Sequence, residues 1–159
     1  MRLTQKLGKK VCFATVSCRK GIMIGIVIVT HSQLGDALID AAEFILGTRP
    51  DTMVSVSIDL NENVDKLRKK IAEGIKKVDH NQGVLILTDM FGGTPSNLSY
   101  SFLEEGRVEV ISGVNLPILI KAFDIQKKME LSKLAEHLEA FGKKSISLAS
   151  GILKGNKRT

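Results

Sequence analysis

Ile22-Met-Ile-Gly-Ile-Val-Ile-Val-Thr-His-Ser-Gln-Leu34 is the stretch that decides the fold of this chain. A run of β-branched apolar residues ends abruptly at Thr30-His31-Ser32, and an amphipathic helix pattern begins directly after it. A strand that is apolar on both faces is typical of the centre of a parallel sheet. Ligands of open α/β sheets bind beyond the carboxyl ends of such strands. His31 therefore stands where chemistry is expected.

Strands and helices alternate along the rest of the chain. The pattern predicts strands at 22–29, 53–58, 84–87, 108–112 and 145–149, and helices at 33–46, 64–78, 94–105, 116–128 and 131–141. Asn61 is the expected N-cap of the second helix, Thr94 that of the third, and Gly142 is expected to end the fifth. Such alternation indicates an α/β fold: a doubly wound, mainly parallel sheet of order 2-1-3-4 with helices on both faces. The short last strand is expected at the edge of the sheet.

Length and charge divide the chain unevenly. Its 159 residues suggest one domain, and we expect a basic N-terminal extension at 1–22, a folded domain at 23–153 and a disordered tail at 154–159. The extension holds six basic residues and no acid, whereas the rest of the chain holds 17 basic and 17 acidic residues. The formal net charge of +6 therefore says nothing about the folded domain, and a nucleic-acid partner loses its main support. Met23 is a candidate natural start, which would place the extension upstream of the fold.

The cysteines and the apolar runs bear on the location of the protein. Cys12 and Cys18 both lie in the basic extension, so the folded domain has neither a disulfide framework nor a cysteine-rich metal site. The extension makes a poor signal peptide because its apolar core is short. No run approaches the ~20 apolar residues of a membrane helix. We expect a cytoplasmic protein without membrane insertion.

The third strand ends in Asp89, and this residue gives His31 a partner. In a sheet of order 2-1-3-4 the first and third strands are neighbours, so His31 and Asp89 are expected at adjacent strand ends. A carboxylate can accept a hydrogen bond from one imidazole nitrogen, which leaves the other free as a nucleophile. We interpret His31 as a nucleophile that carries a phosphoryl group and Asp89 as the residue that orients it. His80 lies in a polar turn and His137 lies off the apolar face of the fifth predicted helix, so neither is assigned a role.

Residues next to this pair could hold the phosphoryl oxygens. Gly92 and Gly93 let the backbone approach closely, Thr94 offers a hydroxyl, and helix amino termini favour anions. Thr30 and Ser32 at the end of the first strand complete the candidate phosphate-binding set. No metal site and no cofactor are expected, since no paired acids end the first strand and no nucleotide-binding motif occurs.

Three stretches resemble a known family: Ile24-Gly-Ile-Val-Ile-Val-Thr-His31, Asp89-Met-Phe-Gly-Gly-Thr-Pro-Ser-Asn97 and Gly113-Val-Asn-Leu-Pro117. They are similar to the mannose-family IIA component of the bacterial sugar phosphotransferase system, over about 23–153. The resemblance implies a histidine phosphocarrier that takes phosphate from phospho-HPr and gives it to a separate IIB component, with His31 phosphorylated and Asp89 as its partner. It also implies a homodimer that exchanges its last strand, 145–149.

Two other functions stay open at this point. The related subunit of dihydroxyacetone kinase shares the first stretch but lacks Gly-Gly-Thr-Pro after the aspartate, so a phosphoryl relay of that type ranks second. A module that senses a small anion without turnover is the alternative from a different class. Transfer of label from phospho-HPr to His31 separates a phosphocarrier from such a sensing module.

Overall fold

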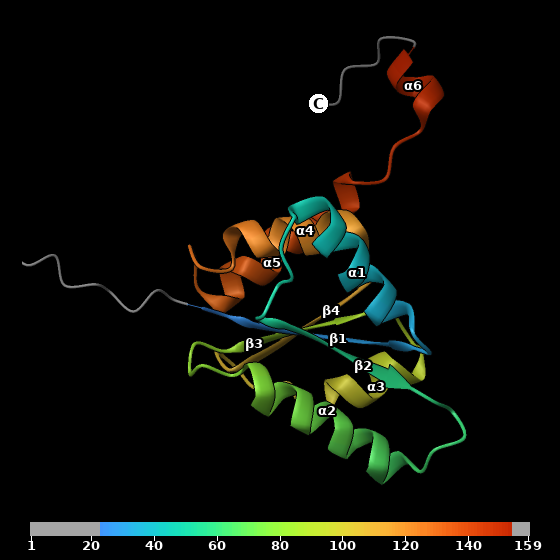
Figure 1. Cartoon of the computed structure of the whole chain (residues 1–159), viewed down its shortest axis with the longest axis vertical. Coiled ribbons are helices and arrows are strands. Elements are labelled where there is room, and N and C mark those ends of the chain that lie inside the picture. The colour runs from blue at the N-terminus through green and yellow to red at the C-terminus, as the bar shows by residue number, and fades with distance from the viewer. Residues whose placement is uncertain (1–22, 154–159) are drawn as a thin grey trace, which may run out of the picture.

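The structure is a computed structural model, and it describes residues 23–153 (Figure 1). The predicted extension 1–22 and tail 154–159 lie outside the described residues. The elements follow in the order β1 (Gly25–His31), α1 (Leu34–Leu46), β2 (Met53–Ile58), α2 (Val64–Val78), β3 (Val84–Thr88), α3 (Thr94–Tyr100), β4 (Val108–Ser112), α4 (Leu116–Ile125), α5 (Leu131–Lys144) and α6 (Ala149–Leu153). The described part of the chain contains no helix long and apolar enough to cross a membrane.

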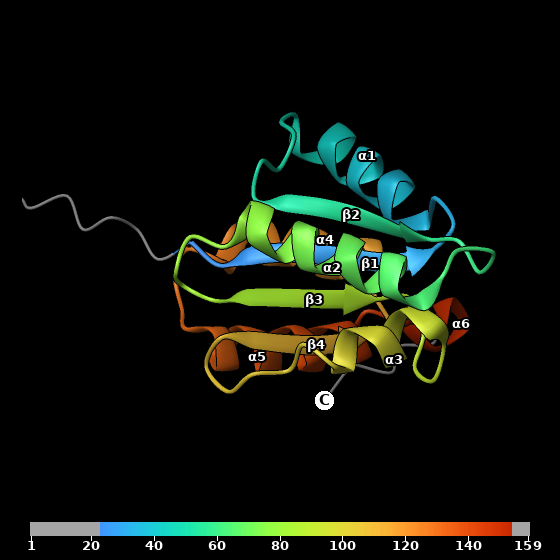
Figure 2. The ribbon, with the colours of Figure 1, turned by 90° about the horizontal axis from the view of Figure 1, so that it is seen from below.

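The sheet has the predicted order. Its strands run β2-β1-β3-β4, and every neighbouring pair is parallel (Figure 2). Helices α1, α4 and α5 cover one face, and α2 and α3 cover the other (Figure 1). The doubly wound α/β prediction is therefore confirmed. Because all strands are parallel, their carboxyl ends meet at one edge of the sheet, and β1 and β3 end there side by side.

Alternation along β1 explains why its sequence is apolar throughout. Ile26 and Ile28 belong to the core under α1, α4 and α5, whereas Val27 and Val29 belong to the core under α2. All four side chains are fully buried. Gly25 begins the strand because a Cβ atom there would lie 2.3 Å from the Val78 carbonyl oxygen at the end of α2. The central strand is thus fixed by packing on both faces.

Several predicted boundaries are wrong. Asn63, not Asn61, caps α2: its side-chain oxygen accepts the Asp65 N–H at 2.7 Å, while Asn61 donates to Asp59.

The C-terminal ends of three helices also differ from the prediction. Helix α3 ends at Tyr100 and α4 at Ile125, both earlier than predicted. Gly142 does not end α5, because the helix continues to Lys144, and a Cβ at Gly142 would lie 2.5 Å from Ile118 Cδ1. Close packing against α4, rather than helix termination, requires this glycine.

The predicted last strand, 145–149, is also absent. The segment leaves the end of α5, extends away from the folded body and leads into α6 (Figure 1). None of the four strands in the described residues pairs with it. Its apolar residues Ile146 and Leu148 are 83% and 77% exposed. A strand forms only against a partner edge, and the segment reaches no edge of its own sheet.

Candidate functional site

His31 and Asp89 meet at the carboxyl edge of the sheet. His31 is the last residue of β1, and Asp89 directly follows β3. The Asp89 Oδ2 lies 2.7 Å from His31 Nδ1 and also accepts the His31 backbone N–H at 2.9 Å. Oδ1 accepts the Met90 N–H at 2.9 Å. A carboxylate can only accept, so Nδ1 carries the proton and Nε2 keeps its lone pair.

The charge of Asp89 is stabilised where it sits. Burial of the carboxyl raises its pKa, but hydrogen bonds from the His31 backbone and ring, the charge of that ring and the Met90 N–H outweigh this effect. The net result is a pKa of Asp89 below its ordinary value. The Asp89 side chain is 11% exposed and that of His31 is 35% exposed. An anchored carboxylate therefore holds an imidazole that solvent can still reach.

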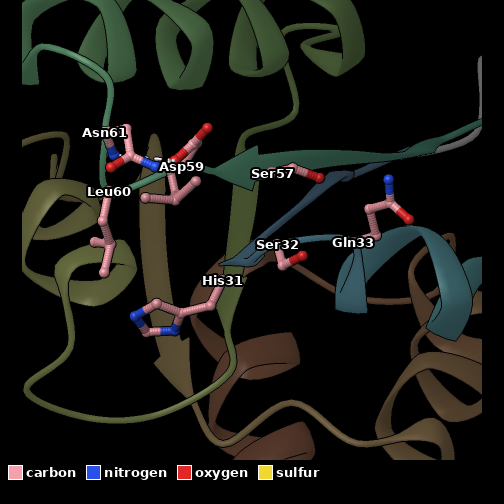
Figure 3. Close-up of a pocket in the computed structure, with 8 residues that line it drawn as sticks. His31, Ser32, Gln33, Ser57, Asp59, Leu60 and Asn61 are labelled. Atoms are coloured by element: carbon pink, nitrogen blue, oxygen red, sulfur yellow. Dashed lines mark hydrogen bonds between the residues drawn. The ribbon is translucent and has the colours of Figure 1, made fainter.

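A hollow of about 560 Å³ lies beside the imidazole. Its other wall is the loop after β2, with Asp59, Leu60 and Asn61 across from His31 (Figure 3). Leu60 is 67% exposed. No sequence motif marks this loop, because a single exposed leucine among polar residues is ordinary on a protein surface. The free side of His31 thus faces an open hollow with one apolar residue on its rim.

The loop between β3 and α3 passes against the ring. A Cβ atom at Gly93 would lie 3.0 Å from His31 Cε1 and 3.6 Å from Nε2, so only glycine allows this approach without displacement of the ring. Gly92 has a φ of +79°, which favours glycine. Hydrogen bonds from Ser96 to the Gly93 carbonyl and from Asn97 to the Gly92 carbonyl hold the loop. Gly93 therefore lies next to the candidate nucleophile, and Gly92 allows the turn that precedes it.

Thr94 is the first residue of α3 and not its N-cap. Gly93 holds the cap position, and Pro95 follows in the first turn. The predicted capping role of Thr94 is wrong because the backbone enters the helix one residue earlier than expected. The Thr94 hydroxyl makes no capping hydrogen bond, and the residue is half-buried where the loop joins α3.

Thr30 does not fit the phosphate-binding role that the sequence suggested. Strand alternation turns its side chain to the face covered by α1, away from the face of His31. There it is fully buried, and its hydroxyl accepts the Gly35 N–H at 2.8 Å. Ser32 is exposed, with a φ of +49°, and its N–H donates to the Ile58 carbonyl at 3.2 Å. The Thr30 hydroxyl is thus taken up by the first turn of α1 and is not available at the free side of His31.

The other histidines lie elsewhere. His80 is exposed in the turn after α2, and His137 is exposed on α5. Among residues 23–153 no group of three or more His, Cys, Asp or Glu side chains is placed to hold a metal ion. Of the described histidines, His31 is the one bonded to a carboxylate.

Comparison with known proteins places this chain in a family. Residues 25–139 match the family model EIIA-man, described as "PTS system fructose IIA component". The chain belongs to this family. It is a phosphotransferase component of a sugar phosphotransferase system and thus one step of a phosphoryl relay.

Curated relatives agree with the family model. The chain is 31% identical over 133 residues to the fructose-specific EIIA component of Bacillus subtilis (strain 168), covering 83% of this chain and 90% of that protein. It is 35% identical over 99 residues to the mannose-specific EIIAB component of Escherichia coli (strain K12), which is 62% of this chain but only 30% of that protein. It therefore spans less than a third of the latter relative.

Solved structures share the fold. A phosphotransferase system component EIIA from Streptococcus agalactiae superposes with a TM-score of 0.71 at 25% identity, covering 80% of this chain and 98% of that one. A mannose/sorbose-specific IIA subunit from Enterococcus faecalis superposes with a TM-score of 0.70 at 20% identity, covering 79% and 94%. The α/β architecture is thus that of known IIA proteins.

Proposed function

We propose that His31 is the phosphocarrier of this component. It accepts the phosphoryl group of phospho-HPr at Nε2 and passes it to a IIB component. The observation that carries the proposal is the 2.7 Å contact between His31 Nδ1 and Asp89 Oδ2, which leaves Nε2 as the nucleophile. The Nε2 lone pair forms a bond to phosphorus while the bond from phosphorus to the donor histidine breaks, and the donor ring keeps that electron pair.

Asp89 has two parts in this step. Its acceptance of the Nδ1 proton fixes the tautomer before transfer. After transfer the imidazole carries positive charge, and the adjacent carboxylate, whose pKa lies below its ordinary value, offsets that charge. Two further hydrogen bonds, from the His31 and Met90 backbones, keep the carboxylate in place throughout.

The loop beside the ring supplies the groups that hold the phosphoryl oxygens. The backbone of Gly92 and Gly93 and the hydroxyls of Thr94 and Ser32 are the candidates: Gly93 lies against the ring, Gly92 and Thr94 flank it in the chain, and Ser32 follows His31. Backbone N–H groups bind anions without a metal. We infer that transfer from phospho-HPr needs no divalent cation.

The partners follow from the relay. HPr is the donor and a IIB component on a separate chain is the acceptor, both in the cytoplasm. We infer a homodimer as well, supported by the exposed apolar residues of the C-terminal segment: Ile146, Leu148, Ile152 and Leu153, exposed by 83%, 77%, 54% and 86%. An apolar group of this kind in one short segment is typical of a covered surface.

The test is incubation with phospho-HPr followed by mass spectrometry of the intact protein. We expect one phosphoryl group, stable in base and labile in acid, as a phosphoramidate is. His31→Gln should abolish the label, whereas His80→Gln and His137→Gln serve as matched controls and should keep it. Retained label in the His31 variant, or loss of wild-type label with EDTA, contradicts the mechanism.

A further inference from the structure

A chain of three hydroxyls lies next to the His31–Asp89 pair and has no part in the transfer step. The Thr88 hydroxyl donates to the Ser112 hydroxyl at 2.9 Å, and the Tyr100 hydroxyl lies 3.2 Å from the same Ser112 oxygen. The three residues come from the ends of β3, β4 and α3. Thr88 is fully buried and immediately precedes Asp89. The network therefore fixes the root of the loop that carries Asp89.

The ring of Tyr100 contacts the same loop in its middle. Its centroid lies 6.2 Å from that of Phe91, with the two planes tilted by 48°. This geometry is favourable for an aromatic pair. Phe91 is 78% exposed, and its position in the chain is between Asp89 and Gly93. Tyr100 thus restrains the loop at two places, through its hydroxyl at the root and through its ring at Phe91.

The loop needs external restraints because its own sequence gives it little rigidity. Gly92 and Gly93 have the widest conformational freedom of any residue type. The far end of the loop is held by hydrogen bonds from α3 to the carbonyls of those glycines. In the near half, the Gly113 and Val114 N–H groups donate to the Thr88 carbonyl at 2.9 Å each. The side-chain contacts beyond those of Asp89 come from Tyr100 and Ser112. A shift of this half would move the carboxylate away from His31.

We propose that Tyr100 is a positioning residue for the His31–Asp89 pair. Its hydroxyl, through Ser112, and its ring, through Phe91, hold the loop in the shape that keeps Asp89 on His31 Nδ1. Tyr100 touches no reacting atom and acts through Asp89 alone. The inference rests on the proposed function for its effect on transfer, but its effect on the imidazole does not depend on that function.

The experiment has two readouts on the full chain. Nitrogen-15 NMR of the His31 ring reports which nitrogen carries the proton, and a time course with phospho-HPr gives kcat and KM for labelling. Tyr100→Leu removes both restraints and should populate the Nε2–H tautomer and lower kcat by about 10-fold, which corresponds to about 1.4 kcal/mol. Tyr100→Phe removes one hydrogen bond and Ser112→Ala removes two. Each should lower kcat by about 3-fold, which is within the value of a single hydrogen bond. Tyr100→Phe keeps the ring contact and should restore most of the Nδ1–H tautomer.

Phe102→Leu is the matched control. Phe102 packs against the core under α2, and its loss lowers stability without touching the loop. It should leave tautomer and kcat unchanged. The proposal is overturned if Tyr100→Leu has the same kcat and the same His31 tautomer as the wild type. It is also overturned if Tyr100→Leu raises KM without lowering kcat. If Tyr100→Leu does not fold, Tyr100→Phe and Ser112→Ala decide by the same criteria. A wild-type chain that takes no label while the tautomer still responds to Tyr100 refutes the proposed function and leaves the positioning role standing.

Discussion

The loop 89–94 and the C-terminal segment 145–153, which includes the short helix α6, are held in place in different ways. The loop contains Gly92 and Gly93 and exposes Met90 and Phe91, yet hydrogen bonds fix it at both ends, and Asp89 alone accepts three. The segment carries four large apolar side chains, all of which are at least 54% exposed. Burial of apolar area drives folding only where a surface is available to cover it. Directional bonds within one chain can thus order a glycine-rich loop that exposes apolar side chains, while the C-terminal apolar segment needs a second surface.

The largest effect is expected when the apolar side chains of the C-terminal segment are replaced by charged ones. The double change Ile146→Asp and Leu148→Asp should weaken the proposed homodimer by about 10²–10⁴-fold, because each buried aliphatic side chain contributes about 1.5–3 kcal/mol. Analytical ultracentrifugation over a concentration series measures this. Ser147→Asp adds charge to the same segment and should change association far less. An unchanged dimer in the double variant contradicts a packed role for the segment.

Removal of the Asp89 charge is the next test. Asp89→Asn should lower the rate of labelling by phospho-HPr by about 10²-fold, since an amide cannot offset the charge of the phosphorylated ring and can select the wrong tautomer. The loss is smaller than the ~10⁴-fold of the same change in a serine-protease triad, because no proton relay is needed here. Asp59→Asn changes an acid on the same hollow that does not contact His31, and it should retain the wild-type rate.

Crowding of the imidazole should have a smaller effect. Gly93→Ala places a Cβ 3.0 Å from His31 Cε1, so the ring must move by a few tenths of an ångström. We expect labelling to slow by about 3–10-fold, as misplacement of reacting groups predicts, with little change in Tm. Gly151→Ala, where a Cβ meets nothing within 4 Å, is the control. Equal rates for both variants would show that the loop tolerates displacement.

The pH dependence of stability sharpens the account of the Asp89 charge. The pKa of this carboxyl is lower in the folded than in the unfolded chain, so the unfolded chain binds its proton first as the pH falls. The stabilising contribution is therefore present above the ordinary aspartate pKa of about 4 and is lost as the pH falls through the lower folded value. Urea unfolding of wild type and Asp89→Asn should show a difference in unfolding free energy that shrinks below about pH 4. A difference that grows on acidification contradicts the pKa shift.

Removal of residues 1–22 should have no effect. Their basic, acid-free composition and the position of Met23 before β1 suggest that they contribute nothing to the fold. A chain beginning at Met23 should match the full chain in Tm, dimerisation and labelling. A Tm lower by many degrees would show that the extension is part of the folded domain.

Local patterns were enough to predict the centre of the molecule. Both faces of the β1 stretch are apolar, which predicted a central strand with His31 at its carboxyl end. The sheet order then brought Asp89 beside it. These inferences succeeded because strand period and parallel topology are set by near neighbours along the chain. The cap of α2 and the role of Gly142 failed because contacts between elements decided them.

The sequence by itself determined the α/β class, the strand order, and the meeting of a histidine with an aspartate at adjacent strand ends. Only the tertiary structure decided that Thr30 faces α1, that Tyr100 joins Ser112 and Phe91, and that the segment after α5 pairs with no strand in the described residues. The physical reason is the distance along the chain over which each kind of interaction acts. Hydrophobic periodicity is written into consecutive residues, whereas a hydroxyl or an apolar side chain finds its partner only after distant segments have packed.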